Sequence, residues 1–112
     1  MNRLFVYGTL APGKPNHHVI SDLVGEWENA TVKGKLVNEG WGSGHDCPGL
    51  IPSEEAPEVQ GYVFTSTDLT DSWDMLDKFE GSDYKRELVA AKLSNGDTVE
   101  TYVYSVNKSL QV

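Results

Sequence analysis

Frequent interruption by glycine and proline is the feature that most constrains this chain. Its 112 residues include 11 Gly and 5 Pro, which separate short apolar runs rich in β-branched and aromatic residues. Such runs, bounded by turn residues, are typical of strands in a small β-dominated domain. The runs lie at Leu4–Tyr7, Thr31–Val37, Val59–Thr65, Arg86–Leu93 and Thr98–Val106. Because short strands leave exposed sheet edges, we expect five or six of them to close on themselves.

The charge balance excludes several classes of partner. Seventeen Asp and Glu face nine Lys and Arg, a formal net charge of −8 at pH 7, which argues against binding to a nucleic-acid backbone or to an anionic membrane surface. No apolar run is long enough to span a bilayer, and no signal-peptide pattern follows Met1. Cys47 stands alone. We therefore expect one domain over residues 1–112, in the cytoplasm.

The last two apolar runs are predicted to form a β-hairpin. Asn95-Gly96 lies between them and favours a two-residue type I′ turn. That turn places Leu93 opposite Thr98, Val89 opposite Tyr102 and Glu87 opposite Tyr104. Because side chains alternate along a strand, Tyr102 and Tyr104 share one face, while Val99, Thr101 and Val103 share the other.

One helix is predicted over Thr70–Glu80, and a second is possible near Asn16–Leu23. Thr70 or Asp71 is suited to cap the first helix, and Gly81 is suited to end it. At 100° per residue, one stripe of this helix contains Leu69, Trp73, Leu76 and Glu80, with Asp77 on its flank.

The segment Asn38–Pro57 is too rich in Gly and Pro to favour regular structure. Long loops in compact domains are more often functional than idle. We expect this segment to cover or border a site, with a lid at Gly40–Gly49.

Glu80 is the first candidate for chemistry. An inward position would desolvate its carboxylate, and Asp77 one turn back would add like-charge repulsion, so both effects would raise the pKa of Glu80. A raised carboxyl pKa suits proton transfer at neutral pH. The alternative is that Glu80 ends the helix with its head group in water.

Two further groups of residues have both a structural and a functional interpretation. The turn Tyr7-Gly8-Thr9-Leu10 follows the first strand, and its amides either bind an anion or form an ordinary tight turn. Tyr84, Tyr102 and Tyr104, together with Arg86, either belong to the core or reach into a cavity.

A metal site is not predicted. His17, His18, His45, Asp46 and Cys47 are ligand types, but no recognised metal-binding spacing joins them. A metal-dependent hydrolase, or a catalytic role for Cys47, is therefore the weakest interpretation.

Taken together, these segments resemble the gamma-glutamyl cyclotransferase family, particularly its small gamma-glutamylamine cyclotransferase-like branch. The resemblance covers most of the chain and is most specific at two motifs about 70 residues apart. These are Phe5-Val6-Tyr7-Gly8-Thr9-Leu10 and the segment from Leu76-Asp77-Lys78-Phe79-Glu80-Gly81 to Tyr84-Lys85-Arg86.

The resemblance implies an α+β, β-dominated fold: a small closed mixed β-barrel of about six strands with one or two short helices. It implies that Glu80 is the catalytic acid/base and that backbone amides of the turn hold the gamma-glutamyl group. The substrate-binding residues it implies are Tyr7, Gly8, Thr9, Leu10, Tyr84 and Tyr104, and for Arg86 it suggests a structural role.

The activity expected from this resemblance is release of an amine or amino acid from a gamma-glutamyl amide, with formation of 5-oxoproline. The substrate's own α-amino group attacks its γ-carbonyl, so no metal, cofactor or covalent nucleophile is needed. We expect a small-molecule substrate and a monomer or weak dimer. The alternative function is a non-catalytic small-molecule-binding or interaction module on the same fold.

Overall fold

The structure is a computed structural model, and it describes residues 2–8, 12–14, 17–37, 49–81 and 84–106. Its strands are β1 (Arg3–Val6), β2 (Glu26–Val37), β3 (Gly49–Pro52), β4 (Glu58–Thr65), β5 (Tyr84–Leu93) and β6 (Thr98–Val106). Its helical segments are the 3₁₀ helices η1 (His17–Val19) and η2 (Thr67–Asp71) and the α-helix α1 (Trp73–Glu80).

Five of these strands close into a barrel. β1 pairs with β4, β4 with β2, β2 with β5, and β5 with β6, and the parallel pairing of β6 with β1 completes the circuit. β3 lies outside this circuit and pairs with β2 and β6. The α+β, β-dominated mixed barrel is therefore confirmed, with five strands in the barrel and a sixth beside it.

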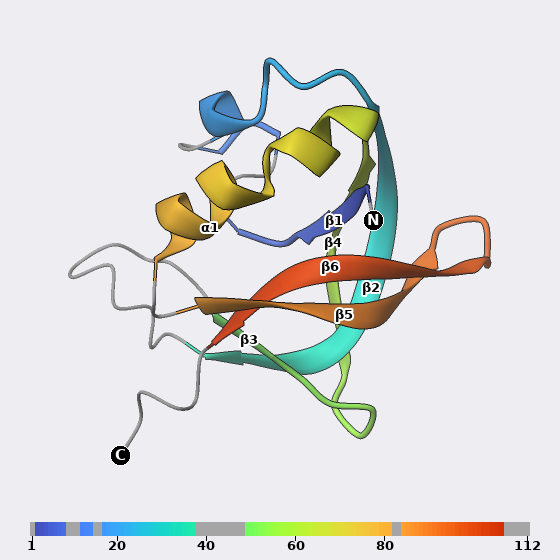
Figure 1. Ribbon diagram of the computed structural model, residues 1–112. Coiled ribbons are helices and arrows are strands. Elements are labelled where there is room, and N and C mark those ends of the chain that lie inside the picture. Colours follow the sequence, from blue (N-terminus) through green and yellow to red (C-terminus); the bar gives the residue numbers. More distant parts are fainter. Residues whose placement is uncertain (1, 9–11, 15–16, 38–48, 82–83, 107–112) are drawn as a thin grey trace.

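Two apolar clusters lie on opposite sides of the barrel wall. The interior cluster takes residues from all five barrel strands and from β3; its buried members are Phe5, Ala30, Val32, Leu50, Val59, Val63, Ala91, Leu93 and Val103. The helix-side cluster lies between the barrel and the helices; its buried members are Leu4, Val6, Ile20, Phe64, Leu69, Leu76 and Tyr104. Figure 1 shows α1 and η1 on one side of the barrel and β3 on the other.

The predicted helix exists, but it begins earlier and in two pieces. η2 starts after Ser66, whose hydroxyl accepts a hydrogen bond from the Asp68 amide at 3.1 Å. The predicted caps Thr70 and Asp71 lie inside η2, so that part of the prediction was wrong. Gly81 ends α1 as predicted, with φ +80° and its amide donating to the Asp77 carbonyl. Near Asn16–Leu23 the described residues contain only the short turn η1.

The sequence predicts no regular structure within Asn38–Pro57, yet β3 lies there, so this prediction was wrong for Gly49–Pro52. Leu50 is fully buried and lies opposite Leu36 of β2. Gly34, two residues before Leu36, permits the close approach of Leu50, since a Cβ at Gly34 would lie 2.7 Å from the Leu50 side chain. β3 forms because distant strands cover it, a cause that local composition does not reveal. The predicted lid residues 40–48 lie outside the described residues.

The β5–β6 hairpin is present, but its predicted register was wrong by one residue. Arg86 is opposite Tyr104, and Leu88 is opposite Tyr102. The Leu93 amide donates to the Asp97 carbonyl, and this bond closes a loop of three residues. The last of these, Gly96, adopts φ +95°. This is the arrangement of a turn followed by a left-handed glycine, rather than the two-residue type I′ turn. The Asn95 side chain supports it by accepting from the Asp97 amide at 2.9 Å.

Candidate functional site

Glu80 lies at the last position of α1, on the stripe that faces the helix-side cluster. Leu69 and Leu76 on this stripe are fully buried, and Trp73 is half-buried. Glu80 is itself mostly buried, and this burial raises the pKa of its carboxyl from 4.5 to about 7. The predicted direction of the shift is confirmed, but burial causes it, without the predicted repulsion from Asp77. The result is a carboxyl group that is half-ionised near neutral pH.

Asp77 instead takes part in a network with two other residues. Its Oδ1 accepts a hydrogen bond of 2.6 Å from the Tyr104 hydroxyl. Its Oδ2 lies 3.5 Å from Nη2 of Arg86. The sequence interpretation treated Asp77 only as a neighbouring charge and missed this role. The corrected register explains the contact, because Arg86 and Tyr104 are directly opposite each other on one face of the hairpin.

The Arg86 guanidinium packs against two aromatic rings that also contact each other. Its Cζ lies 4.7 Å from the ring centre of Trp73 and 4.8 Å from that of Tyr102. Nη1 is buried and has no hydrogen-bond partner among the described residues. The two ring faces stabilise a cation in this position, so Arg86 connects α1 to the hairpin and keeps a positive charge beside Asp77.

Tyr104 is buried at the meeting point of α1, β5 and β6. Burial, followed by the hydrogen bond to Asp77, raises the pKa of its phenol well above the usual range, and the charge of Glu80 acts in the same direction. Tyr104 also lines a cavity of about 520 Å³ with six other residues, namely Asp77, Lys78, Gly81, Tyr84, Lys85 and Arg86. The structure thus brings Tyr84 and Tyr104 together at one cavity, next to the helix end that carries Glu80.

Tyr7 joins the end of β1 to two other strands. Its hydroxyl donates to the Tyr104 carbonyl at 2.6 Å and accepts from the Leu50 amide at 3.0 Å. Gly8 follows it and is half-buried. Thr9 and Leu10, the other predicted substrate-binding residues of this turn, lie outside the described residues. Tyr7 therefore holds the end of β1 directly beside the backbone of Tyr104.

The candidate metal ligands do not form a site in the described part of the chain. His17 packs against the Trp27 ring, with 5.5 Å between ring centres, and His18 is exposed. Residues 45–47 lie outside the described ranges. Where the structure does describe the chain, it contains no group of three or more His, Cys, Asp or Glu residues that could hold a metal ion. The described helices are also all too short or too polar to span a bilayer.

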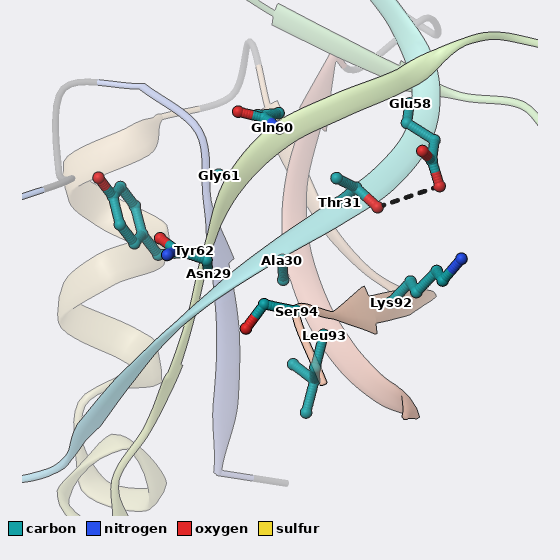
Figure 2. A pocket seen from close by; sticks show the side chains of 10 residues that line it. All are labelled: Asn29, Ala30, Thr31, Glu58, Gln60, Gly61, Tyr62, Lys92, Leu93 and Ser94. Carbon is teal, nitrogen blue, oxygen red and sulfur yellow. Dashed lines mark hydrogen bonds between the residues drawn. The ribbon is translucent and has the colours of Figure 1, made fainter. Parts of the chain in front are cut away.

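A separate cavity of about 600 Å³ opens on β2, β4 and the end of β5 (Figure 2). Polar side chains dominate its lining, and the Thr31 hydroxyl of β2 donates to Glu58 of the neighbouring strand β4 at 3.3 Å. None of the predicted site residues lines this cavity. We therefore place the candidate site at the Tyr104 cavity.

The closed mixed barrel, with helices packed on one side, defines a cyclotransferase-like fold. The chain belongs to the family described as "Gamma-glutamyl cyclotransferase, AIG2-like", whose model matches residues 4–112. Comparison with curated proteins yields no match.

Solved structures of similar proteins agree with this assignment. An AIG2-like protein from Mus musculus is 28% identical, with a TM-score of 0.73 over 95% of this chain and 77% of its own. YkqA from Bacillus subtilis is 27% identical, with a TM-score of 0.74 over 95% of this chain. This chain spans only 36% of the length of YkqA. A protein from Arabidopsis thaliana is 26% identical, with a TM-score of 0.67 over 94% of this chain and 68% of its own.

Proposed function

We propose that this protein converts a gamma-glutamyl amide into 5-oxoproline and a free amine, with Glu80 as general acid/base. The observation that carries the proposal is the mostly buried Glu80 carboxyl, whose pKa of about 7 lets it accept and return a proton near neutral pH. Membership of the gamma-glutamyl cyclotransferase family supports the same reaction class.

In the proposed reaction, ionised Glu80 removes a proton from the substrate's α-ammonium group. The α-nitrogen then attacks the γ-carbonyl carbon, the bond from this carbon to the leaving nitrogen breaks, and a five-membered lactam forms. Glu80 returns this proton to the leaving nitrogen. The α-nitrogen loses its second proton as it becomes the lactam N–H, and that proton also passes to the leaving group, which departs as an ammonium ion, so that protons balance. Holding the substrate folded makes this attack intramolecular and lowers its entropic cost. Water is not consumed.

The proposed binding residues belong to the turn after β1 and to the Tyr104 cavity. Backbone amides of the turn from Tyr7 through Gly8 and Thr9 to Leu10 would hold the glutamyl carboxylate or the developing oxyanion. Tyr84 and Tyr104 would contact the substrate from the cavity they line. None of these assigned contacts selects the leaving amine, so the residues that recognise it must lie outside this set.

The test is to incubate the protein with a panel of gamma-glutamyl amines and to measure 5-oxoproline. Glu80→Gln should lower kcat/KM by about 10²- to 10⁴-fold. Asp74→Asn is the matched control, since Asp74 is an exposed carboxylate on the same helix, and it should leave the rate unchanged. Equal activity of the Glu80→Gln variant would contradict the assigned role.

The pH dependence supplies a second criterion. Because the base form of Glu80 is required, kcat/KM should rise about tenfold per pH unit below pH 7 and level off above it. Ligand binding, seen as a shift in melting temperature, without any 5-oxoproline would favour the non-catalytic binding module instead.

A further inference from the structure

The Tyr104 hydroxyl has one proton, and the structure shows where that proton goes. The hydroxyl donates to Asp77 Oδ1 at 2.6 Å. An ionised carboxylate can only accept hydrogen bonds, so the single phenolic proton is committed to Asp77. What remains free on the Tyr104 oxygen is acceptor capacity.

Asp77 is held in place for this contact from two directions. It belongs to the last turn of α1, where its own carbonyl accepts the Gly81 amide at 3.0 Å. Its second carboxylate oxygen faces Arg86 at 3.5 Å, and Arg86 packs against the rings of Trp73 and Tyr102. A charge-assisted bond from a phenol to such a carboxylate is strong and well oriented. Tyr104 therefore cannot readily turn its proton toward the cavity.

The charged groups that face Tyr104 determine which ligand group suits it. Asp77 and Glu80 on α1 contribute negative charge, and Arg86 on β5 contributes positive charge. Arg86 is already paired with Asp77, and its Nη1 is buried. A ligand group at the free side of the Tyr104 oxygen would therefore meet an acceptor in surroundings to which Glu80 adds negative charge. A cationic N–H donor fits this position, and a carboxylate does not.

We propose that Asp77 is a positioning residue that fixes the Tyr104 hydroxyl as an acceptor for the ligand's ammonium group, so that Tyr104 selects the amine end of the substrate and not its carboxylate. The proposal rests on the proposed function, because it assumes a gamma-glutamyl ligand. It adds that Tyr104 binds the ammonium end of that ligand, and that Asp77 makes the Tyr104 hydroxyl an acceptor.

Three ligands distinguish recognition of the substrate's ammonium group from recognition of its carboxylate. They are γ-glutamyl methylamide, glutaric acid monomethylamide, which lacks the α-amino group, and 4-amino-N-methylbutanamide, which lacks the carboxylate. Binding is measured by calorimetry at pH 7 in a Glu80→Gln background, which prevents cyclisation. Tyr104→Phe should weaken the two amine-bearing ligands about tenfold, as expected for a hydrogen bond to a charged group. It should leave glutaric acid monomethylamide unchanged.

Two Asp77 variants then test the positioning role. Asp77→Ala frees the phenolic proton, so the preference for γ-glutamyl methylamide over its des-amino analogue should fall several-fold. Asp77→Asn retains a carbonyl oxygen that can accept from Tyr104 and should keep more of that preference. Asp74→Asn should leave it unchanged. A purely structural role for Asp77 would weaken all three ligands equally, and that result would overturn the proposal.

A ligand-free measurement distinguishes failure of this inference from failure of the proposed function. The Tyr104 ring carbon attached to oxygen is followed by NMR during a pH titration, and Asp77→Ala should move the titration of Tyr104 to lower pH. An unchanged titration would overturn the Asp77 contact whatever the ligand.

The binding experiment has two further outcomes. If Tyr104→Phe weakens the carboxylate-only ligand most, Tyr104 binds the carboxylate end and this inference alone fails. If none of the three ligands binds, the gamma-glutamyl proposal fails and the ammonium assignment fails with it.

Discussion

The two faces of β6 differ in what they contribute, although their residues alternate along one strand. Val103 and Val99 point to the interior cluster, which is built from aliphatic side chains and Phe5. Tyr102 and Tyr104 point to the helix-side cluster, where they meet Trp73, Arg86 and Asp77. The first face stabilises the barrel by burial alone. The second also buries ionisable groups, and burying such groups costs stability unless they are paired.

The largest expected effect is on the interior face. Phe5→Ala should lower the free energy of unfolding by about 3 to 5 kcal/mol, because Phe5 is fully buried and the cavity left behind cannot collapse well inside a closed barrel. Urea denaturation at pH 5 and pH 8 should give the same loss, since the cluster's buried members do not titrate in this range. A loss that depends on pH would show that the two faces are coupled.

On the helix side, Glu80→Gln is expected to raise the free energy of unfolding, whereas Phe5→Ala lowers it. The folded-state pKa of about 7 exceeds the unfolded value of 4.5, so between these values the folded protein holds a proton that the unfolded chain releases. Wild-type stability therefore falls as pH rises from about 4.5 to about 7. At pH 8 the glutamine variant should be more stable than wild type by up to about 3 kcal/mol, and below pH 4 the two should be equal. Chemical denaturation across this range checks both limits, and equal stability at pH 8 would contradict the burial of Glu80.

A smaller effect is expected from Arg86→Lys, which tests how the helix side is held together. Lysine keeps the positive charge but loses the planar contact with Trp73 and Tyr102. We expect the free energy of unfolding to fall by about 1 kcal/mol, measured by urea denaturation. Wild-type stability in the lysine variant would mean that charge alone accounts for the role of Arg86.

The smallest effect is expected outside both clusters, at the hairpin turn. Asn95→Ala removes the exposed hydrogen bond to the Asp97 amide and should cost about 0.5 kcal/mol. Asn95→Asp keeps an acceptor and should retain wild-type stability in the same thermal unfolding experiment. A loss as large as that of Phe5→Ala would show that the turn, rather than the clusters, determines the register.

Much of the candidate site could be predicted because its signals are local. The stripe from Leu69 to Glu80 follows from helical geometry, and Gly81 ends the helix through its own backbone freedom. The rise in the Glu80 pKa follows once that stripe is placed against a core. The catalytic role of Glu80 and the binding roles of Tyr7, Gly8, Thr9, Leu10, Tyr84 and Tyr104 stay predictions until the variants are measured.

The sequence by itself determined where most strands lie, where the helix ends, and which face of β6 is aliphatic and which aromatic. These properties depend on side chains only a few positions apart. Only the tertiary structure decided that Gly49–Pro52 forms a strand, that Arg86 rather than Glu87 lies opposite Tyr104, and that Asp77 binds the Tyr104 hydroxyl. Each of these depends on contacts between distant segments. A one-residue difference in the hairpin loop changes which side chain meets Tyr104, and no local pattern distinguishes the two registers.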